Sequence, residues 1–320
     1  MNKMISPGIL ALSLVSVFFF LTSCSLHMTS EKTDLLAFQH SPFPYEGTVP
    51  GMGKPFLDVS TADGQRGHTS LRGGVYWQDA TYSDRRVMMT IPKKFDVNRP
   101  AVLVVFLHGN ESILERDVRD RQQVPRQLAE SGLNAVLVAP QFAVDAKDSS
   151  AGHFWEQGFF ADFLDEAAEQ AAQLHHDVRY RRALEQAPVV LVAYSGGYQA
   201  AAYALDAGGA DRRIKGVILL DALYGQEEKF AGWIARHRHQ MFFFSSYTEP
   251  ARAGNEHLKQ LLAAQNISMQ DIVPTQLSPG QVSFFAFDPA VEHKDLLTQA
   301  WVEFPFADLM RKCNYLTNTP

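Results

Sequence analysis

Cysteine is scarce in this sequence: only Cys24 and Cys313 occur among 320 residues. Two cysteines allow at most one disulfide, which excludes a small disulfide-stapled scaffold. There is no Cys-x-x-Cys motif and no cluster of side chains with the spacing of metal ligands, so a recognisable metal site is also missing. We expect Cys313, close to the C-terminus, to be a structural thiol.

Tracts of lysine and arginine are missing as well. The 29 basic residues are outnumbered by 35 acidic ones, and the formal net charge is −6. This balance argues against nucleic acid as a partner. No segment repeats with a period of roughly 20–50 residues, which excludes a solenoid. A hydrophobic content of 46% with 20% charged residues is typical of a globular protein with a sizeable core.

An apolar run at residues 9–21 is too short for a membrane span. Lys3 precedes it, and the sequence LTSC, which ends at Cys24, follows it directly. This pattern predicts a signal peptide over residues 1–23. Its ending resembles the lipobox of bacterial lipoproteins, which implies that Cys24 is lipidated and becomes the first residue of the mature chain. The alternatives are an ordinary secretory signal and an uncleaved N-terminal anchor.

Ser25 stands directly after the cysteine, where the lipoprotein resemblance implies sorting to the outer membrane. We therefore expect a lipid anchor in the bacterial cell envelope, with the protein in the outer membrane and facing the periplasm. A lipidated Cys24 leaves Cys313 without a disulfide partner. Residues 24–55 are polar and proline-containing and show no periodicity, which predicts a flexible tether.

Short apolar runs then alternate with helix-forming stretches. The predicted strands are residues 86–91, 101–107, 133–139, 189–194, 214–220, 240–246 and 282–287. The predicted helices are residues 124–131, 159–174, 198–205, 229–237, 255–264 and 294–301. This alternation predicts an α/β fold with a mostly parallel central sheet and helices on both faces, in one domain over residues 56–320.

Residues 189–199, with the sequence VVLVAYSGGYQ, carry the most distinctive pattern. A buried strand runs into a tight Ser-Gly-Gly corner, and a segment of helical composition follows. This is the arrangement of a nucleophile elbow, in which a strained turn presents a serine, here Ser195. Ala193 stands where the G-x-S-x-G pattern has its first glycine. The alternative is an ordinary glycine-rich connection in an α/β fold.

A serine nucleophile needs a histidine base and an acid that orients it. Functional loops of parallel sheets gather at the carboxyl ends of the strands. His293 follows the last predicted strand and is the candidate base. Two acids compete, Asp221 after residues 214–220 and Glu249 after residues 240–246. Asp221 is favoured because a carboxylate at the end of a buried run calls for a partner, although a helix cap or loop hydrogen bond would also explain it.

An oxyanion hole needs backbone N–H groups fixed where negative charge develops. Gly196 follows the serine and supplies one such group. The loop His108-Gly109-Asn110 follows a buried strand and is placed to supply the other from Asn110. Loop, serine, acid and histidine, in this order, resemble the α/β-hydrolase family over residues 86–301.

The resemblance implies hydrolysis of an ester or amide through an acyl-enzyme, with no metal or organic cofactor. It leaves the acid open, because most members place it where Glu249 stands and lipase-like members where Asp221 stands. We expect a carboxylic-ester hydrolase of the esterase or lipase kind, without a large lid domain, acting on a small molecule. The alternatives are a peptidase or amidase of the same fold and a non-catalytic envelope protein that retains the fold.

Four arginines follow the oxyanion loop. They suit recognition of a carboxylate or phosphate, and the alternative is that they are solvated or paired with neighbouring acids. The four are Arg116, Arg119, Arg121 and Arg126.

Overall fold

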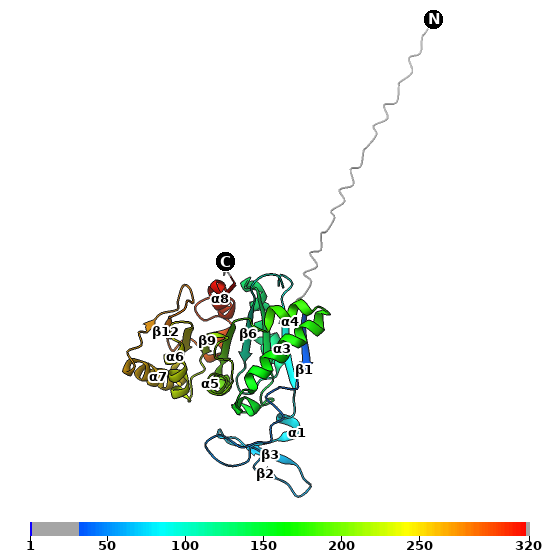
Figure 1. The fold of residues 1–320 in the computed structure, drawn as a ribbon, viewed down its shortest axis with the longest axis vertical. Helices are drawn as coiled ribbons and strands as arrows, with labels where there is room; N and C mark the ends of the chain where they lie inside the picture. Colours follow the sequence, from blue (N-terminus) through cyan, green and yellow to red (C-terminus); the bar gives the residue numbers. More distant parts are fainter. Residues whose placement is uncertain (2–31, 318–320) are drawn as a thin grey trace. The chain divides into compact units, whose positions relative to one another are not determined.

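The computed structural model describes Met1 and residues 32–317 (Figure 1). Apart from Met1, the predicted signal peptide, the predicted lipidation site Cys24 and the start of the predicted tether lie outside these residues. Among the helices of the described residues, none is long and apolar enough to cross a membrane.

A nine-stranded sheet forms the centre of the fold, in the order β1-β5-β7-β6-β8-β9-β10-β12-β11. Its strands are β1 (Lys32–Ala37), β5 (Arg86–Ile91), β6 (Val102–Leu107), β7 (Ala135–Pro140), β8 (Val189–Tyr194), β9 (Ile214–Leu220), β10 (Phe242–Tyr247), β11 (Gln270–Asp271) and β12 (Val282–Ala286). β5 runs antiparallel to its neighbours β1 and β7, and the other neighbouring pairs are parallel.

Helices cover both faces of this sheet. Successive strand residues point to opposite faces, so Val105 and Leu107 of β6 belong to one core cluster, and Val104 and Phe106 to the other. The helices of the first cluster are α3 (Phe159–His175), α4 (Val178–Leu184), α5 (Tyr198–Asp206), α6 (Glu227–His237) and α7 (Arg252–Ala264). The second cluster includes α2 (Val124–Ser131), α8 (Pro305–Lys312) and the π-helical turn η1 (Leu114–Arg121).

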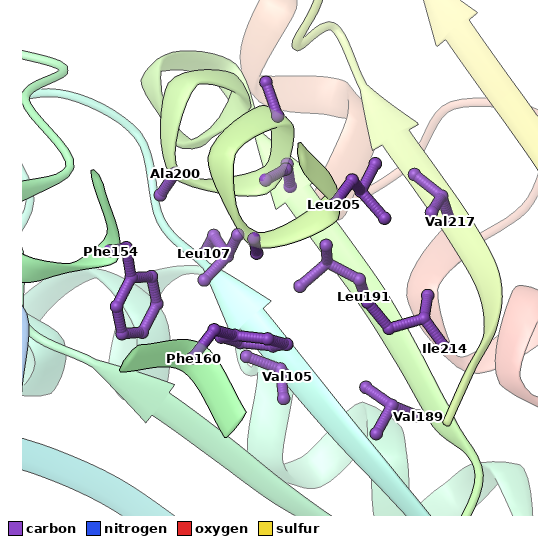
Figure 2. Packing of buried hydrophobic residues seen from close by; sticks show 14 of the residues in the cluster. Val105, Leu107, Phe154, Phe160, Val189, Leu191, Ala200, Leu205, Ile214 and Val217 are labelled. Atoms are coloured by element: carbon purple, nitrogen blue, oxygen red, sulfur yellow. The ribbon is translucent and has the colours of Figure 1, made fainter. Parts of the chain in front are cut away.

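The first cluster lies beneath the candidate nucleophile. Figure 2 shows Leu107 of β6 and Leu191 of β8 close to Ala200 and Leu205 of α5. The mostly parallel sheet with helices on both faces confirms the α/β-hydrolase fold predicted from the sequence. The packing also fixes α5 against the strand that precedes the Ser-Gly-Gly corner.

Residues 32–55 are not a flexible tether, and this part of the prediction is wrong. β1 pairs with β5 along its whole length, and Phe38, Phe43 and Tyr45 are buried. Glu166 of α3 accepts hydrogen bonds from the backbone N–H groups of residues 39 and 40. Local composition suggested a tether because the order of this segment comes from contacts with distant parts of the chain.

A second, three-stranded antiparallel sheet precedes β5 and was not predicted. It consists of β2 (Val59–Ser60), β3 (Arg66–Thr69) and β4 (Val75–Trp77), with the short helix α1 (Gln78–Thr81) after it. In Figure 1 it is set apart from the central sheet, at one end of the described part of the chain. The sheet is too small to be a lid domain, but Arg72 on the β3–β4 connection lines the same cavity as Ser195.

The helix predicted at residues 294–301 is wrong. The structure has a 3₁₀ turn, η5 (His293–Leu297), in which the side chains of Glu292 and Asp295 cap each other's backbone N–H groups. Within this turn the buried residues are Leu296 and Leu297, so a single turn is enough to bury its apolar side chains. The terminal helix is α8, which begins at Pro305, a residue suited to the first turn of a helix.

Candidate active site

Ser195 lies at the corner between β8 and α5, in the 3₁₀ turn η3 (Ser195–Gly197). Its φ of 53° falls in the left-handed region, which is strained for a serine. Gly197 makes the corner possible, since a Cβ at this position would lie 2.3 Å from the carbonyl oxygen of Leu107. Ala193 is buried in β8, and its methyl group packs within the first core cluster. The structure therefore has the strand, strained turn and helix of a nucleophile elbow.

His293 and Asp221 meet at the carboxyl ends of β12 and β9. The Nδ1 atom of His293 lies 2.6 Å from Oδ2 of Asp221. The Asp221 side chain has no exposed surface, whereas that of His293 is 39% exposed. The imidazole is thus anchored to a buried carboxylate on one side and accessible on the other.

Asp221 is ionised in spite of its burial. Thr248, just after β10, donates its backbone N–H to Oδ1 at 2.8 Å and its hydroxyl to Oδ2 at 2.6 Å. Burial by itself raises the pKa of Asp221, but the hydrogen bonds from His293 and Thr248 outweigh it and hold this pKa below its ordinary value. A carboxylate that accepts the Nδ1 proton leaves Nε2 of His293 as the proton-accepting nitrogen.

Tyr194, next to the serine, holds the histidine ring from the side. The two rings stack with centroids 4.8 Å apart and planes inclined by 23°. The Tyr194 hydroxyl donates to the carbonyl oxygen of His293 at 3.4 Å. Ser195 and His293 line the same cavity, and no hydrogen bond joins their side chains among the described residues. Such catalytic contacts are often long without substrate and tighten when it binds.

Glu249, the alternative acid, lies elsewhere. Its side chain is 69% exposed and pairs with Arg252 at 2.6 Å. Of the two predicted acids, Asp221 is the one that the fold brings to His293.

The predicted oxyanion residues are in direct contact. A Cβ at Gly196 would lie 2.3 Å from Oδ1 of Asn110, and the same Oδ1 accepts a hydrogen bond from Ser149 at 3.0 Å. The Asn110 N–H is not engaged in a hydrogen bond with residues 32–317. The Gly196 N–H lies in the first turn of a helical segment, where such groups have no intrahelical partner. Both N–H groups are therefore available to a ligand.

His108 supports this loop, a role that the sequence did not suggest. Its Nε2 accepts the N–H of Phe142 at 2.9 Å and also lies 3.0 Å from Nε2 of Gln141. Its Nδ1 donates to the carbonyl oxygen of Gly109 at 2.8 Å. Burial lowers the pKa of His108 to about 4, so the ring is neutral and ties the predicted oxyanion loop to the end of β7. The sequence feature that could have indicated this role is a histidine directly after a fully apolar strand.

The cavity at this site has a volume of about 600 Å³. Ser195, His293, Asn110 and Tyr224 line it together with five charged side chains. The charged residues are Arg72, Glu111, Arg121, Lys147 and Lys294. Sequence reasoning missed Arg72, Lys147 and Lys294 because they lie on separate connections that meet only in the folded chain.

Three of the four arginines that follow residues 108–110 are paired with acids and do not line this cavity. Arg116 contacts Asp117 and Asp145, Arg119 contacts Asp120, and Arg126 contacts Glu130. Arg121 lines the cavity and also lies 3.0 Å from Asp117.

Cys313 is buried at the end of α8, where its Sγ lies 3.3 Å from the carbonyl oxygen of Leu309. Burial raises the pKa of this thiol, which is consistent with the structural role predicted from the sequence. Within the part of the chain that the structure describes, no three His, Cys, Asp or Glu side chains are grouped as a metal site would require.

No protein-family model matches the sequence, and no curated protein gives a significant match. Solved structures similar to this chain include a feruloyl esterase module from Clostridium thermocellum in complex with sinapinate, at 12% identity and a TM-score of 0.45, covering 84% of this chain and 97% of that one. An S-formylglutathione hydrolase from Agrobacterium tumefaciens matches at 13% identity and a TM-score of 0.43, covering 78% and 94%. An IroE-like serine hydrolase from Shewanella oneidensis matches at 12% identity and a TM-score of 0.44, covering 71% and 74%. Because these identities and TM-scores are low, we infer the function from the geometry of the site.

Proposed function

We propose that the chain is a serine hydrolase that cleaves carboxylic esters through an acyl-enzyme on Ser195. The observation that carries the proposal is the hydrogen bond between His293 and the buried Asp221, at a cavity that a strained serine also lines. A buried carboxylate, an exposed imidazole and a serine in this order are the parts that nucleophilic acyl transfer needs.

In the first half-reaction, Ser195 Oγ attacks the ester carbonyl carbon while Nε2 of His293 takes the hydroxyl proton. The resulting oxyanion accepts hydrogen bonds from the N–H groups of Asn110 and Gly196. The bond to the leaving alcohol breaks, and His293 returns the proton to that alcohol. Asp221 stabilises the imidazolium and keeps the Nδ1 proton in place.

In the second half-reaction, a water molecule attacks the acyl-enzyme. His293 takes a proton from the water, and the bond between the acyl carbon and Ser195 Oγ breaks. Oγ regains its proton from His293, and the carboxylic acid leaves. Every proton transfer in this scheme passes through one nitrogen of one side chain, which explains why the opposite nitrogen is fixed to a buried anion.

A fluorophosphonate probe tests the nucleophile. We expect the probe to label the folded wild-type protein at Ser195, and labelling to be lost in Ser195→Ala and greatly slowed in His293→Ala. A folded protein that is not labelled would reject both the ester-hydrolase proposal and the peptidase or amidase alternative, and would favour a non-catalytic envelope protein. Acyl esters of increasing chain length, assayed beside peptide amides and lactones, then separate the ester hydrolase from the amidase.

We also propose that the enzyme is lipid-anchored at Cys24 and works in the bacterial cell envelope, in the outer membrane and facing the periplasm. The charged start, the short apolar run and the LTSC ending support this proposal. Metabolic labelling with a fatty-acid analogue should mark the wild-type protein and not Cys24→Ser, with Cys313→Ser as the matched control. A protein that carries no lipid and fractionates with soluble proteins would contradict the proposal.

A further inference from the structure

Positive charge is concentrated at the candidate active site. Among the described residues, four cationic side chains and one acid, Glu111, line its cavity, although the whole chain carries a net charge of −6. The four cations come from the β3–β4 connection, the end of η1, the connection after β7, and the residue that follows His293. A concave site lined by one sign of charge attracts ligands of the opposite sign.

Three of these cations have an acidic neighbour. Nζ of Lys147 lies 3.8 Å from Glu111, and Nζ of Lys294 lies 2.7 Å from Glu292. Arg121 contacts Asp117, which Arg116 also contacts, so one carboxylate is shared by two guanidinium groups. These neighbours offset part of the positive charge, and the exposed positions of the three cations weaken each field further.

Arg72 is exposed as well, but it differs from the other three in having no acidic partner among the described residues. Among residues 32–317, its guanidinium takes part in no ion pair and no hydrogen bond; its backbone N–H is bonded to Ser70 Oγ. The guanidinium carbon lies 5.7 Å from the centre of the Tyr224 ring, which also lines the cavity. The five N–H donors of this arginine are therefore available at the wall of the cavity.

The segment that carries Arg72 is fixed to the loop after β7. The Ser70 hydroxyl donates to the carbonyl oxygen of Lys147 at 2.7 Å, and the Lys147 N–H donates to the Tyr76 hydroxyl oxygen at 3.1 Å. Arg72 also lines a smaller neighbouring cavity of about 70 Å³, together with Tyr198 and Gln199 from the start of α5. It therefore lines two hollows, the larger of which contains Ser195 while the smaller borders the start of α5.

We propose that Arg72 binds a carboxylate or phosphate group of the substrate, and that the enzyme prefers anionic esters to neutral esters of the same shape. This proposal rests on the proposed function and names its substrate class. A planar guanidinium with free donors binds such groups with two parallel hydrogen bonds, and the neighbouring lysines strengthen the attraction. The small sheet β2–β4 thereby has a role in substrate selection.

Matched ester pairs test the preference. The probes are 4-acetoxybenzoate, its methyl ester and 4-acetoxyphenyl phosphate, with each kcat/KM divided by the rate of hydrolysis by hydroxide. We expect both anionic esters to exceed the neutral ester by about tenfold at low ionic strength, with the advantage decreasing as salt is added. Arg72→Gln should lower the ratio of anionic to neutral activity by about five- to tenfold, and Arg72→Lys should restore part of it.

Arg182→Gln is the matched control, because it removes the same charge from a different place. Arg182 is exposed on α4 and has no ion pair among the described residues. The control should leave the ratio unchanged. The labelling rate of Ser195 by fluorophosphonates that end in a carboxylate or in its methyl ester gives the same comparison without turnover. Equal rates for the two probes, or equal ratios in Arg72→Gln and Arg182→Gln, would overturn the inference and leave the hydrolase proposal standing. Labelling by neither probe in folded protein would instead reject the hydrolase proposal.

Discussion

Thr248 donates two hydrogen bonds to Asp221, one from its backbone N–H and one from its hydroxyl. The hydroxyl shares Oδ2 with Nδ1 of His293. Thr248, which follows β10, thus holds the Asp221 carboxylate in place. Without such donors, a carboxylate with no exposed surface would take up a proton and could not stabilise an imidazolium.

We expect Thr248→Val to lower kcat by about tenfold with a small change in KM. The variant keeps the shape and the backbone donor but loses a hydrogen bond to a charged group, which contributes roughly 1.5–3 kcal/mol. Steady-state kinetics on an activated acyl ester measure the effect. Thr248→Ser retains the hydroxyl and should retain most of the activity; a Val variant as active as the Ser variant would show that the second donor is unimportant.

The two candidate acids give a sharper comparison. Asp221→Asn should lower kcat by roughly 10³–10⁴-fold, because an amide at this position favours the wrong imidazole tautomer. Glu249→Gln should change kcat less than about twofold, because this side chain is exposed and contacts Arg252. Both variants are assayed with the same ester, after circular dichroism has shown that they fold. Mild losses in both would mean that neither carboxylate orients His293.

The sequence left this choice open for a physical reason. Asp221 and Glu249 follow the neighbouring parallel strands β9 and β10, so strand periodicity places both at the same edge of the sheet. What separates them is the direction of each side chain and the partner it finds. Those features depend on packing, and the Thr248 contact that keeps Asp221 ionised has no signal in the spacing of residues.

Three elements with a clear apolar pattern were predicted with the right limits. The limits of β5, α2 and β9 agree with the structure, because uninterrupted apolar runs or helical periodicity end there at turn-forming residues. β1 was missed because it pairs with β5, which lies far along the chain. The strands of the β2–β4 sheet pair locally, but they are only 2, 4 and 3 residues long, too short to show an apolar pattern. Arg72 was also missed, because its place at the cavity depends on how the β3–β4 connection is held against the loop after β7.

His108 should make the stability of the protein depend on pH. Burial lowers its pKa from 6.5 to about 4 in the folded chain, so the unfolded chain takes up this proton first as the pH falls. The stabilisation is therefore complete above pH 6.5 and decreases as the pH falls toward 4, by about 3 kcal/mol over the full range.

Urea unfolding of wild type and His108→Gln between pH 4.5 and 7 measures this contribution. We expect the variant to be less stable than wild type at pH 7, and the difference to narrow at pH 4.5, because only the wild type loses this stabilisation. Burial also lowers the pKa of His237, so the wild-type slope contains a second contribution of the same sign. The difference between the two proteins removes that contribution. Parallel pH profiles would show that His108 is not protonated on unfolding in this range.

Glu166 should be important for the docking of the N-terminal segment. Its carboxylate accepts the N–H groups of Gln39 and His40, both at 2.7 Å, and lies 2.9 Å from the His40 ring nitrogen Nδ1. The side chain is only 12% exposed, so Glu166→Ala leaves backbone donors without partners and should lower the free energy of unfolding by about 1–3 kcal/mol.

Glu169→Ala is the matched control, because Glu169 lies on the same helix, is 43% exposed and forms a surface ion pair with Arg181. Urea unfolding should show a small effect for this control and a clear loss for Glu166→Ala. Limited proteolysis should in addition cleave the Glu166 variant faster around residue 40, since the end of β1 loses its attachment to α3. Because neither Glu166 nor Glu169 lines the cavity that contains Ser195 and His293, kcat should stay within about twofold of wild type in both variants. Equal stability of the two variants would mean that β1 is held by its pairing with β5 alone, and that the turn after it behaves as the flexible connection expected from its composition.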